Sequence, residues 1–214
     1  MRKLARFLAW TAVIVGALIG LARGFLLRWW TVPENDPYLE ASVAPTLEGG
    51  DVIILWRATK PSFGDLVMCP EPNAPGRMVI GRLYGEEGDD ITVDGDRVIV
   101  NGKASGTERS CTEQTFVAKE PRTGREVTQP CSVEELAGHT SMRGGRGDSK
   151  LAPQQRQTKV APGKVYLVSD NRLFPYDSRD FGTVERASCA ETVLFRLVGR
   201  NGFFDDGRRF EFLR

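Results

Sequence analysis

The chain has 214 residues and a formal net charge of +1; 41% of its residues are hydrophobic and 9% are aromatic. These totals suit one domain with a hydrophobic core and a polar stretch that lowers the average. Lys and Arg are spread along the chain rather than clustered, so we expect no nucleic-acid partner. The single histidine excludes zinc sites of the HExxH type, and we expect neither a metal nor a cofactor.

An apolar segment at the N-terminus is long enough to cross a membrane. Residues 7–22 carry no charge, and residues 24–27 extend the run beyond Arg23. A span needs about 20 apolar residues, and this run reaches that length if the Arg23 guanidinium extends to the interface. We therefore predict a single transmembrane helix and assign residues 1–30 to a cytoplasmic start and a membrane anchor.

The charges beside this segment predict its orientation. Arg2, Lys3 and Arg6 precede the apolar run, and basic flanks stay on the cytoplasmic side. We expect the N-terminus in the cytoplasm and the main domain outside. A cleaved signal peptide and a buried core helix are the alternatives. The length of the run, its charged flanks and the lack of a small-residue cleavage site favour a retained anchor.

The chain after the anchor is predicted to be mostly β. Short apolar or alternating runs, many rich in Val and Ile, are separated by turn residues, and no sustained helical period appears. The expected strands lie at 51–56, 65–68, 78–84, 90–93, 97–100, 165–168, 192–198 and 209–213. They divide a mostly β domain into a first part, 31–103, and a second part, 161–214.

Residues 104–160, between these parts, form a polar insert. The segment is poor in large aliphatic residues and rich in Gly, Arg, Thr and Gln. Such a composition is typical of a small, loosely packed subdomain or of partial disorder, and both interpretations stay open. An Arg-Gly-Asp triplet at 146–148 is interpreted as a solvated loop.

The four cysteines form no CxxC pair, which excludes zinc-ribbon and thioredoxin-like sites. Cys111 and Cys131 flank a polar stretch and can close a loop as a disulfide in an oxidising compartment; whether they do stays open. Cys69 and Cys189 lie in apolar runs, where we expect buried free thiols. Four phenylalanines near the end are assigned to the last core strands in preference to a membrane-contacting patch: Phe203, Phe204, Phe210 and Phe212.

Three segments, in chain order, carry a candidate catalytic site. Residues 42–47 read SVAPTL, residues 81–89 read GRLYGEEGD, and residues 169–182 read SDNRLFPYDSRDFG. Together with the N-terminal apolar segment they resemble the bacterial type I signal peptidases. These are membrane serine peptidases of the Ser/Lys type that remove signal peptides from exported proteins. The resemblance covers the chain apart from the polar insert, and the third segment is its most specific part.

The resemblance implies a β catalytic domain against the outer, periplasmic face of the bacterial inner membrane. The expected partners are the bilayer and exported preproteins, whose residues before the cleavage site bind in a cleft as an added strand. The family's nucleophilic serine corresponds to Ser42. Its base, a lysine directly before an arginine, corresponds to Gly81, because Arg82 and the following glycines align without gaps.

Other positions of the family pattern are altered or kept. The small hydroxyl residue that commonly lies two positions before the nucleophile, and helps to form the oxyanion hole, is Glu40 here. A serine expected near the lysine is missing from residues 173–175. The residues kept around the site are interpreted as a hydrogen-bonded structural cluster: Arg82, Asp170, Asn171, Arg172, Asp177, Ser178 and Arg179.

The missing lysine leaves the activity open. A serine hydroxyl needs a base within hydrogen-bond reach, and losing such a base costs on the order of 10⁴ in rate. Candidate substitutes are Glu40, which shares a strand face with Ser42 if this segment is extended, and Lys60 or Lys164. A Ser–His pair with His139 is a further alternative.

Three hypotheses follow. The protein is an active signal peptidase with a substitute base, or it is an inactive homologue that binds extended peptides or supports an active signal peptidase. The third, an anchored β-domain unrelated to peptide processing, is disfavoured by the segment at 169–182. The sequence does not decide between the first two.

Overall fold

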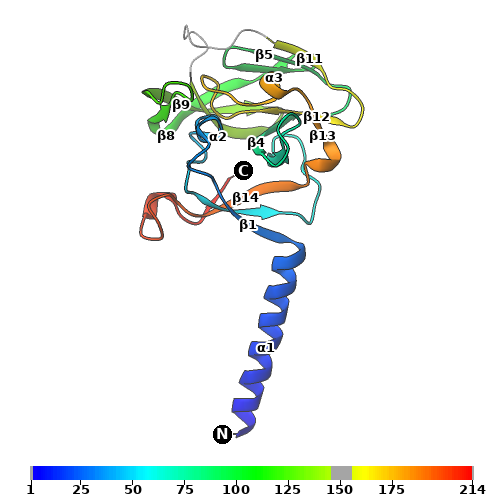
Figure 1. Ribbon diagram of the computed structural model, residues 1–214, viewed down its shortest axis with the longest axis vertical. Coiled ribbons are helices and arrows are strands. Elements are labelled where there is room, and N and C mark those ends of the chain that lie inside the picture. Colours follow the sequence, from blue (N-terminus) through cyan, green and yellow to red (C-terminus); the bar gives the residue numbers. More distant parts are fainter. Residues whose placement is uncertain (1, 146–155, 214) are drawn as a thin grey trace.

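The computed structural model describes residues 2–145 and 156–213. Figure 1 shows a long helix, α1 (Arg2–Phe25), that leads into a β-rich body. The apolar side chains of α1 between Phe7 and Leu21 are exposed. Within the described ranges, no helix combines the length and apolar character that a membrane crossing needs. The transmembrane helix therefore finds no support here and stays a prediction.

The largest sheet has eight strands, and all of its strand pairs are antiparallel. Its order is β1 (Leu27–Thr31), β2 (Val52–Trp56), β14 (Glu191–Val198), β3 (Leu66–Pro70), β4 (Met78–Gly85), β12 (Lys164–Val168) and β13 (Val184–Glu185), with β15 (Glu211–Phe212) beside β14. Residues 27–30 were assigned to the anchor, but they begin the first strand of this sheet. The helix ends earlier because residues 27–31 pair with β2.

Alternation along the strands separates a buried face from an outer face. Ile53 and Leu55 of β2 are fully buried and pack with Ile80 of β4. The short helix α2 (Pro37–Val43) covers this core with Leu39 and Val43. A helix here was not predicted.

The outer face of the same sheet carries an apolar row. The register aligns Trp29 with Ile54, Ile54 with Phe195, and Phe195 with Phe212. The assignment of the four C-terminal phenylalanines to the core is wrong. Their side chains are 53%, 92%, 51% and 67% exposed at Phe203, Phe204, Phe210 and Phe212, because the residues flanking β15 lie along this outer face.

The described part of the insert is built from long strands rather than loose coil. One small sheet lies within the insert and contains β8 (Gly106–Lys119), β9 (Glu126–Leu136) and β10 (His139–Gly144). A second small sheet joins β11 (Arg156–Lys159) of the insert to β5 (Asp90–Asp94), β6 (Arg97–Val100) and β7 (Lys103–Ala104), at the end of the first part of the domain. Each of the predicted strand runs contains a strand. The remaining helical turns are α3 (Ser178–Phe181), η1 (Arg186–Ser188) and η2 (Asp206–Arg208). The Arg-Gly-Asp triplet lies outside the described residues.

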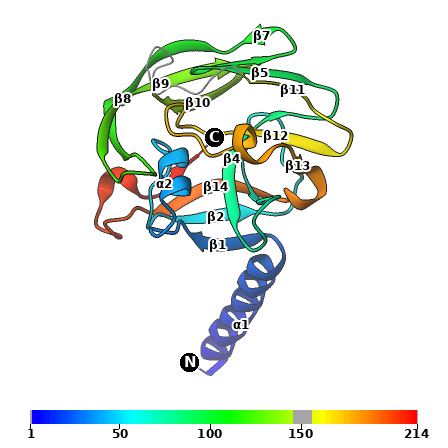
Figure 2. The same ribbon diagram turned by 45° about the horizontal axis from the view of Figure 1, so that its top comes forward.

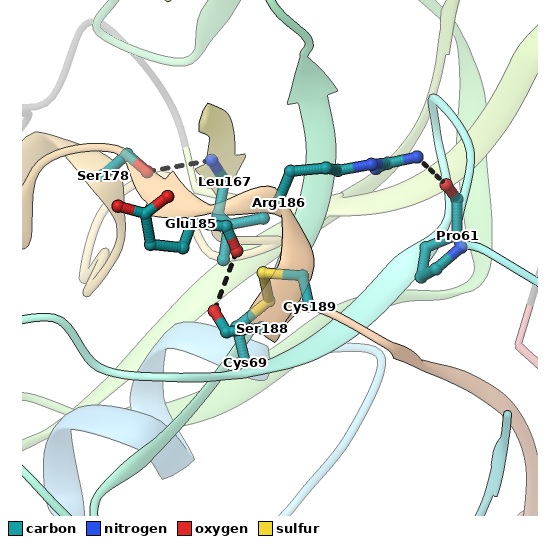
Figure 3. The surroundings of a disulfide bond; sticks show 8 residues. All are labelled: Pro61, Cys69, Leu167, Ser178, Glu185, Arg186, Ser188 and Cys189. Atoms are coloured by element: carbon teal, nitrogen blue, oxygen red, sulfur yellow. Dashed lines mark hydrogen bonds between the residues drawn. A yellow bond between two sulfur atoms is a disulfide. The ribbon is translucent and has the colours of Figure 1, made fainter. Parts of the chain in front are cut away.

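The β-rich body contains two disulfides. Cys111–Cys131, which the sequence left open, links β8 to β9. The prediction of free thiols at Cys69 and Cys189 is wrong, because β3 and the turn before β14 bring their Cα atoms to 4.6 Å and the pair is oxidised. Figure 3 shows this disulfide beside β12 and the η1 turn.

Candidate functional site

Ser42 lies in the last turn of α2 and is fully buried. The helix starts where the Asp36 carboxylate accepts a hydrogen bond from the Leu39 N–H at 3.0 Å, with Pro37 in the first turn. The Ser42 hydroxyl donates to the Leu39 carbonyl at 3.0 Å, one turn back. Because the segment is helical, Glu40 and Ser42 point in different directions, and the expectation of a shared strand face is wrong.

The Ser42 segment is joined to the third motif by backbone and side-chain bonds. The Asn171 N–H donates to the Ser42 carbonyl oxygen at 3.0 Å. The Thr46 hydroxyl donates to the Asp170 carboxylate at 2.5 Å, and both residues are almost fully buried. The segment that carries the candidate nucleophile therefore lies directly against the loop that follows β12.

The same aspartate fixes the second motif. Arg82 of β4 donates from Nε and Nη2 to the two oxygens of Asp170, at 3.0 and 3.2 Å. Burial acts to lower the pKa of Arg82, but the Asp170 carboxylate outweighs it, so the pKa of Arg82 lies above its ordinary value. Thr46, Asp170 and Arg82 thus connect the three motifs in a buried ion-pair cluster.

Asn171 and Arg172 hold the loop from its other side. The Asn171 side-chain oxygen accepts from the N–H groups of Leu173 and Phe174 at 3.0 and 3.1 Å. The Arg172 guanidinium binds the Glu134 carboxylate of β9, where the Tyr84 hydroxyl also donates, at 3.3 Å. Burial raises the pKa of Tyr84 to about 12, and the nearby Glu134 carboxylate adds to this shift.

The end of the third motif is a second buried ion pair. Asp177 caps α3 and accepts from Nε and Nη2 of Arg179, at 2.9 and 2.7 Å, and from the Ser169 N–H at 2.7 Å. Burial acts to raise the pKa of Asp177, but Arg179 and these hydrogen bonds lower it below its ordinary value. The Ser178 hydroxyl accepts from the Leu167 N–H at 2.9 Å, which ties α3 to β12.

Position 81 offers no group that could take a proton. Gly81 pairs with Val67 in β3 and lies on the face of β4 opposite to Arg82. A Cβ added there would lie 3.2 Å from Leu167 Cβ and 3.3 Å from the Val168 carbonyl oxygen, so β12 packs closely against it.

The other candidate bases have different surroundings. The Glu40 carboxylate lies 3.7 Å from the Arg200 guanidinium, and Lys164 forms an ion pair with Glu185. Lys60 and His139 line a separate cavity between β10 and β14, where the His139 ring packs against Gly64. Among the residues that the structure describes, the Ser42 hydroxyl makes one hydrogen bond, to the Leu39 carbonyl.

Sequence reasoning missed three residues that build this site. Thr46 was only part of a quoted motif, and Tyr84 and Glu134 were not singled out. Glu134 lies in an alternating polar strand, and its partner Arg172 is 38 positions away, so no local pattern indicated their pairing. The roles of Ser42, Glu40 and Gly81 stay predictions.

A cavity of about 460 Å³ opens beside α2. It lies between Tyr38, the turn after β8 and the loop of residues 173–175. Arg122, Arg156 and Asp180 also line this cavity. Tyr38 belongs to α2, the helix that carries Ser42, and the volume of this cavity can hold side chains of a bound peptide.

Comparisons with known proteins agree with the motifs. A family model described as signal peptidase, peptidase S26, matches residues 4–198. Signal peptidase I of Bacillus caldolyticus is 28% identical over 159 residues, which cover 72% of this chain and 74% of that protein. Signal peptidase I V of Bacillus subtilis strain 168 is 27% identical over 131 residues, covering 60% and 62%. A crystal structure of a signal peptidase I from Enterococcus faecalis V583 superposes with a TM-score of 0.41 at 20% identity, covering 63% of this chain and 97% of the other.

Proposed function

The chain belongs to the signal peptidase family, peptidase S26, and from this premise we propose that it acts on signal peptides of exported preproteins with Ser42 as the nucleophile. Membership of this family supports signal-peptide cleavage as the general activity. The observation that carries the assignment to Ser42 is the Asp170–Asn171 junction. Asn171 bonds the Ser42 backbone, while Asp170 joins Thr46 to Arg82.

The proposed reaction is acyl transfer to the Ser42 hydroxyl followed by hydrolysis. Its first step needs a base for the hydroxyl proton, and glycine at position 81 supplies none. We therefore expect slow cleavage, with a deficit on the order of 10⁴ relative to a site with its base in place.

A second candidate function is peptide binding without cleavage. Two observations favour it: the Ser42 hydroxyl is bonded to a backbone carbonyl, and position 81 is closely packed against β12. In this alternative the protein binds extended peptides or supports an active signal peptidase. The frame around the site would then be kept for recognition alone.

We further propose that the protein works at the bacterial inner membrane, with its body on the periplasmic side. The apolar exposed surface of α1, preceded by basic residues, supports a membrane contact. The apolar row from Trp29 to Phe212 lies on the outer face of the sheet, whose first strand, β1, directly follows α1. Two disulfides support an oxidising compartment.

A preprotein assay tests the catalytic proposal. The purified full chain is incubated in detergent with a preprotein, in parallel with Ser42→Ala. We expect slow loss of the signal peptide that Ser42→Ala abolishes. Equal rates for both proteins would eliminate Ser42 as the nucleophile.

The binding alternative is measured separately, with a fluorescent signal peptide titrated to high micromolar concentration. Saturable binding without cleavage by the unmodified chain would establish the second candidate function. A signal peptide that neither binds nor is cleaved would contradict both candidates.

A further inference from the structure

A hairpin of the insert covers the Ser42 segment. We call residues 115–130 the flap; they are the outer parts of β8 and β9 and the turn between them. Four flap side chains share one face, because the register pairs Phe116 with Gln129 and Ala118 with Val127. Figure 2 shows β8 extending from the insert toward α2.

The shared face of the flap packs on the helix of the candidate nucleophile. Ala118 belongs to one buried cluster with Ala41 of α2 and with Leu173, and the Phe116 ring packs against this cluster. A Cβ on Gly144 would overlap the Phe116 ring and lie 3.3 Å from Pro45 Cδ, so this ring fills the space beside the Ser42–Pro45 segment. With the flap in this position, no solvent reaches Ser42.

The flap is separated from the rest of the insert by a break in the strand pairing. Ser110 pairs with Ser132 and Thr115 with Pro130, so residues 111–114 of β8 stand opposite Cys131 alone. Such a bulge interrupts the ladder and lets a strand bend. The Cys111–Cys131 disulfide crosses at this point and holds the base of the flap in place.

The covered state leaves polar groups unpaired. Among the described residues, both polar atoms of the Gln129 side chain and the Asn171 Nδ2 group are buried without a hydrogen-bond partner. Unpaired buried polar groups oppose burial, so the flap is held by its apolar contacts against this cost. Opening would return the Gln129 amide to water.

We propose that the flap is an autoinhibitory cover that swings about the bulge to admit an extended peptide to Ser42. This rests on the proposed function for the identity of the peptide, but the motion itself does not require catalysis. The cavity between Tyr38 and the flap turn lies at the free end of the flap, where an entering peptide would first make contact. A resting protein therefore has a covered nucleophile, and access depends on the opening equilibrium of residues 115–130.

Alkylation of a cysteine at position 42 measures access directly. Ser42→Cys introduces one reactive thiol into the full chain, because all four native cysteines are in disulfides. We expect slow reaction with a small maleimide, and a rate at least about tenfold higher when Phe116→Ser weakens the flap contacts. Val117→Ser is the matched control: Val117 is 59% exposed on the opposite face of the same strand, and its replacement should leave the rate unchanged.

Equal alkylation rates with and without Phe116→Ser would overturn the cover. Hydrogen exchange on the unmodified chain gives a second measurement that needs no variant. The amides of the flap and of α2 should exchange through an opening whose free energy is lower than that of global unfolding. If these amides exchange only when the amides of the main sheet do, the proposal is overturned. The two proposals can fail separately. Fast alkylation of Ser42→Cys in the presence of Phe116→Ser, together with no preprotein cleavage by the chain that keeps Ser42, would support the flap and contradict the catalytic role of Ser42.

Discussion

At the scale of single residues, the proposed cleavage by Ser42 has to proceed with Gly81 at the position where the family has its base lysine. Hydrogen bonds connect the segments around the site. The Asp170 carboxylate accepts from Arg82 and Thr46, and the Asn171 N–H donates to the Ser42 carbonyl oxygen. Among the described residues, the Ser42 hydroxyl has one hydrogen bond, to the Leu39 carbonyl, and none to an amine. A lysine in a buried position can have its pKa lowered toward neutrality and act as a base, which glycine cannot do.

We predict that Gly81→Lys increases preprotein cleavage by at least about tenfold, since a base typically contributes 10²–10⁴ in rate and part is lost to imperfect placement. The new Cβ, 3.2 Å from Leu167 Cβ, requires β4 and β12 to separate by a few tenths of an ångström. Cleavage is measured across a pH series, where activity should rise as the lysine deprotonates. Gly81→Met, similar in length without an amine, should show no gain; equal gains in both variants would refute a proton-accepting role.

The Asp177–Arg179 pair predicts a pH dependence of stability. The pKa of Asp177 is below its ordinary value in the folded protein, so its contribution is complete above about pH 4 and is lost as the pH falls through the folded-state pKa. Asp177→Asn should lower the unfolding free energy near neutral pH by about 3–5 kcal/mol, as expected when one partner of a buried pair is removed. Below about pH 4 the difference from the unmodified protein should shrink.

Urea unfolding at a series of pH values measures this difference. Burial raises the pKa of the neighbouring Asp180, so its titration changes stability with pH in the direction opposite to that of Asp177. The quantity to follow is therefore the difference in unfolding free energy between Asp177→Asn and the unmodified protein at each pH. Asp94→Asn, at an exposed strand end, is the control and should change the unfolding free energy only slightly. A constant gap for Asp177→Asn down to acid pH would contradict the ion-pair explanation.

At the scale of elements, the sequence predicted strands better than it predicted what covers them. Runs such as 51–56 alternate or are continuously apolar, and the pattern needs only a few residues. α2 has seven residues, too few for a helical period, although Asp36-Pro37 at its start is a recognisable cap. The flap was missed because its apolar face has few large side chains and the rest of the strand is polar.

The sequence motifs identified the segments of the candidate site but not the contacts between their side chains. The three segments meet around Asp170, and the pairing of Arg172 with Glu134 joins the site to the insert across the fold. No local rule could indicate which arginine would find which carboxylate. The same limit explains Cys69 and Cys189: apolar context indicated burial correctly, but their proximity depends on how β3 and β14 pair.

The two disulfides should contribute unequally to stability. Cys69–Cys189 joins residues 120 positions apart, whereas Cys111–Cys131 spans 20. In the chain-entropy model these loops correspond to about 5 and about 3 kcal/mol at 25 °C. We predict that replacing both cysteines of the first pair by alanine lowers the unfolding free energy more than the same change in the second pair, as measured by denaturant titration. The reverse order would show that strain or residual unfolded structure outweighs loop closure.

At the scale of the whole molecule, the fold separates a site side from an apolar outer sheet face. The flap of the insert packs on α2, which carries Ser42, while β1, β2, β14 and β15 carry the outward row of aromatic and aliphatic side chains. Figure 1 shows these four strands at the end of the body from which α1 leaves. Rings continue this row from Phe195 through Phe210 and Phe203 to Phe204, which is 92% exposed. Such a contiguous apolar surface, next to an exposed apolar helix, is typical of contact with a lipid interface.

We predict that Phe204 enters the lipid interface when the full chain is bound to vesicles. Phe204→Cys can be labelled selectively with an environment-sensitive fluorophore, because the native cysteines are paired. Its emission should shift to shorter wavelength on vesicles and be quenched by lipids brominated near the headgroup. Val117→Cys, exposed on the insert, is the control and should show neither effect. An unchanged spectrum at position 204, in protein that co-floats with the vesicles, would mean that α1 binds the membrane while the sheet face stays in water.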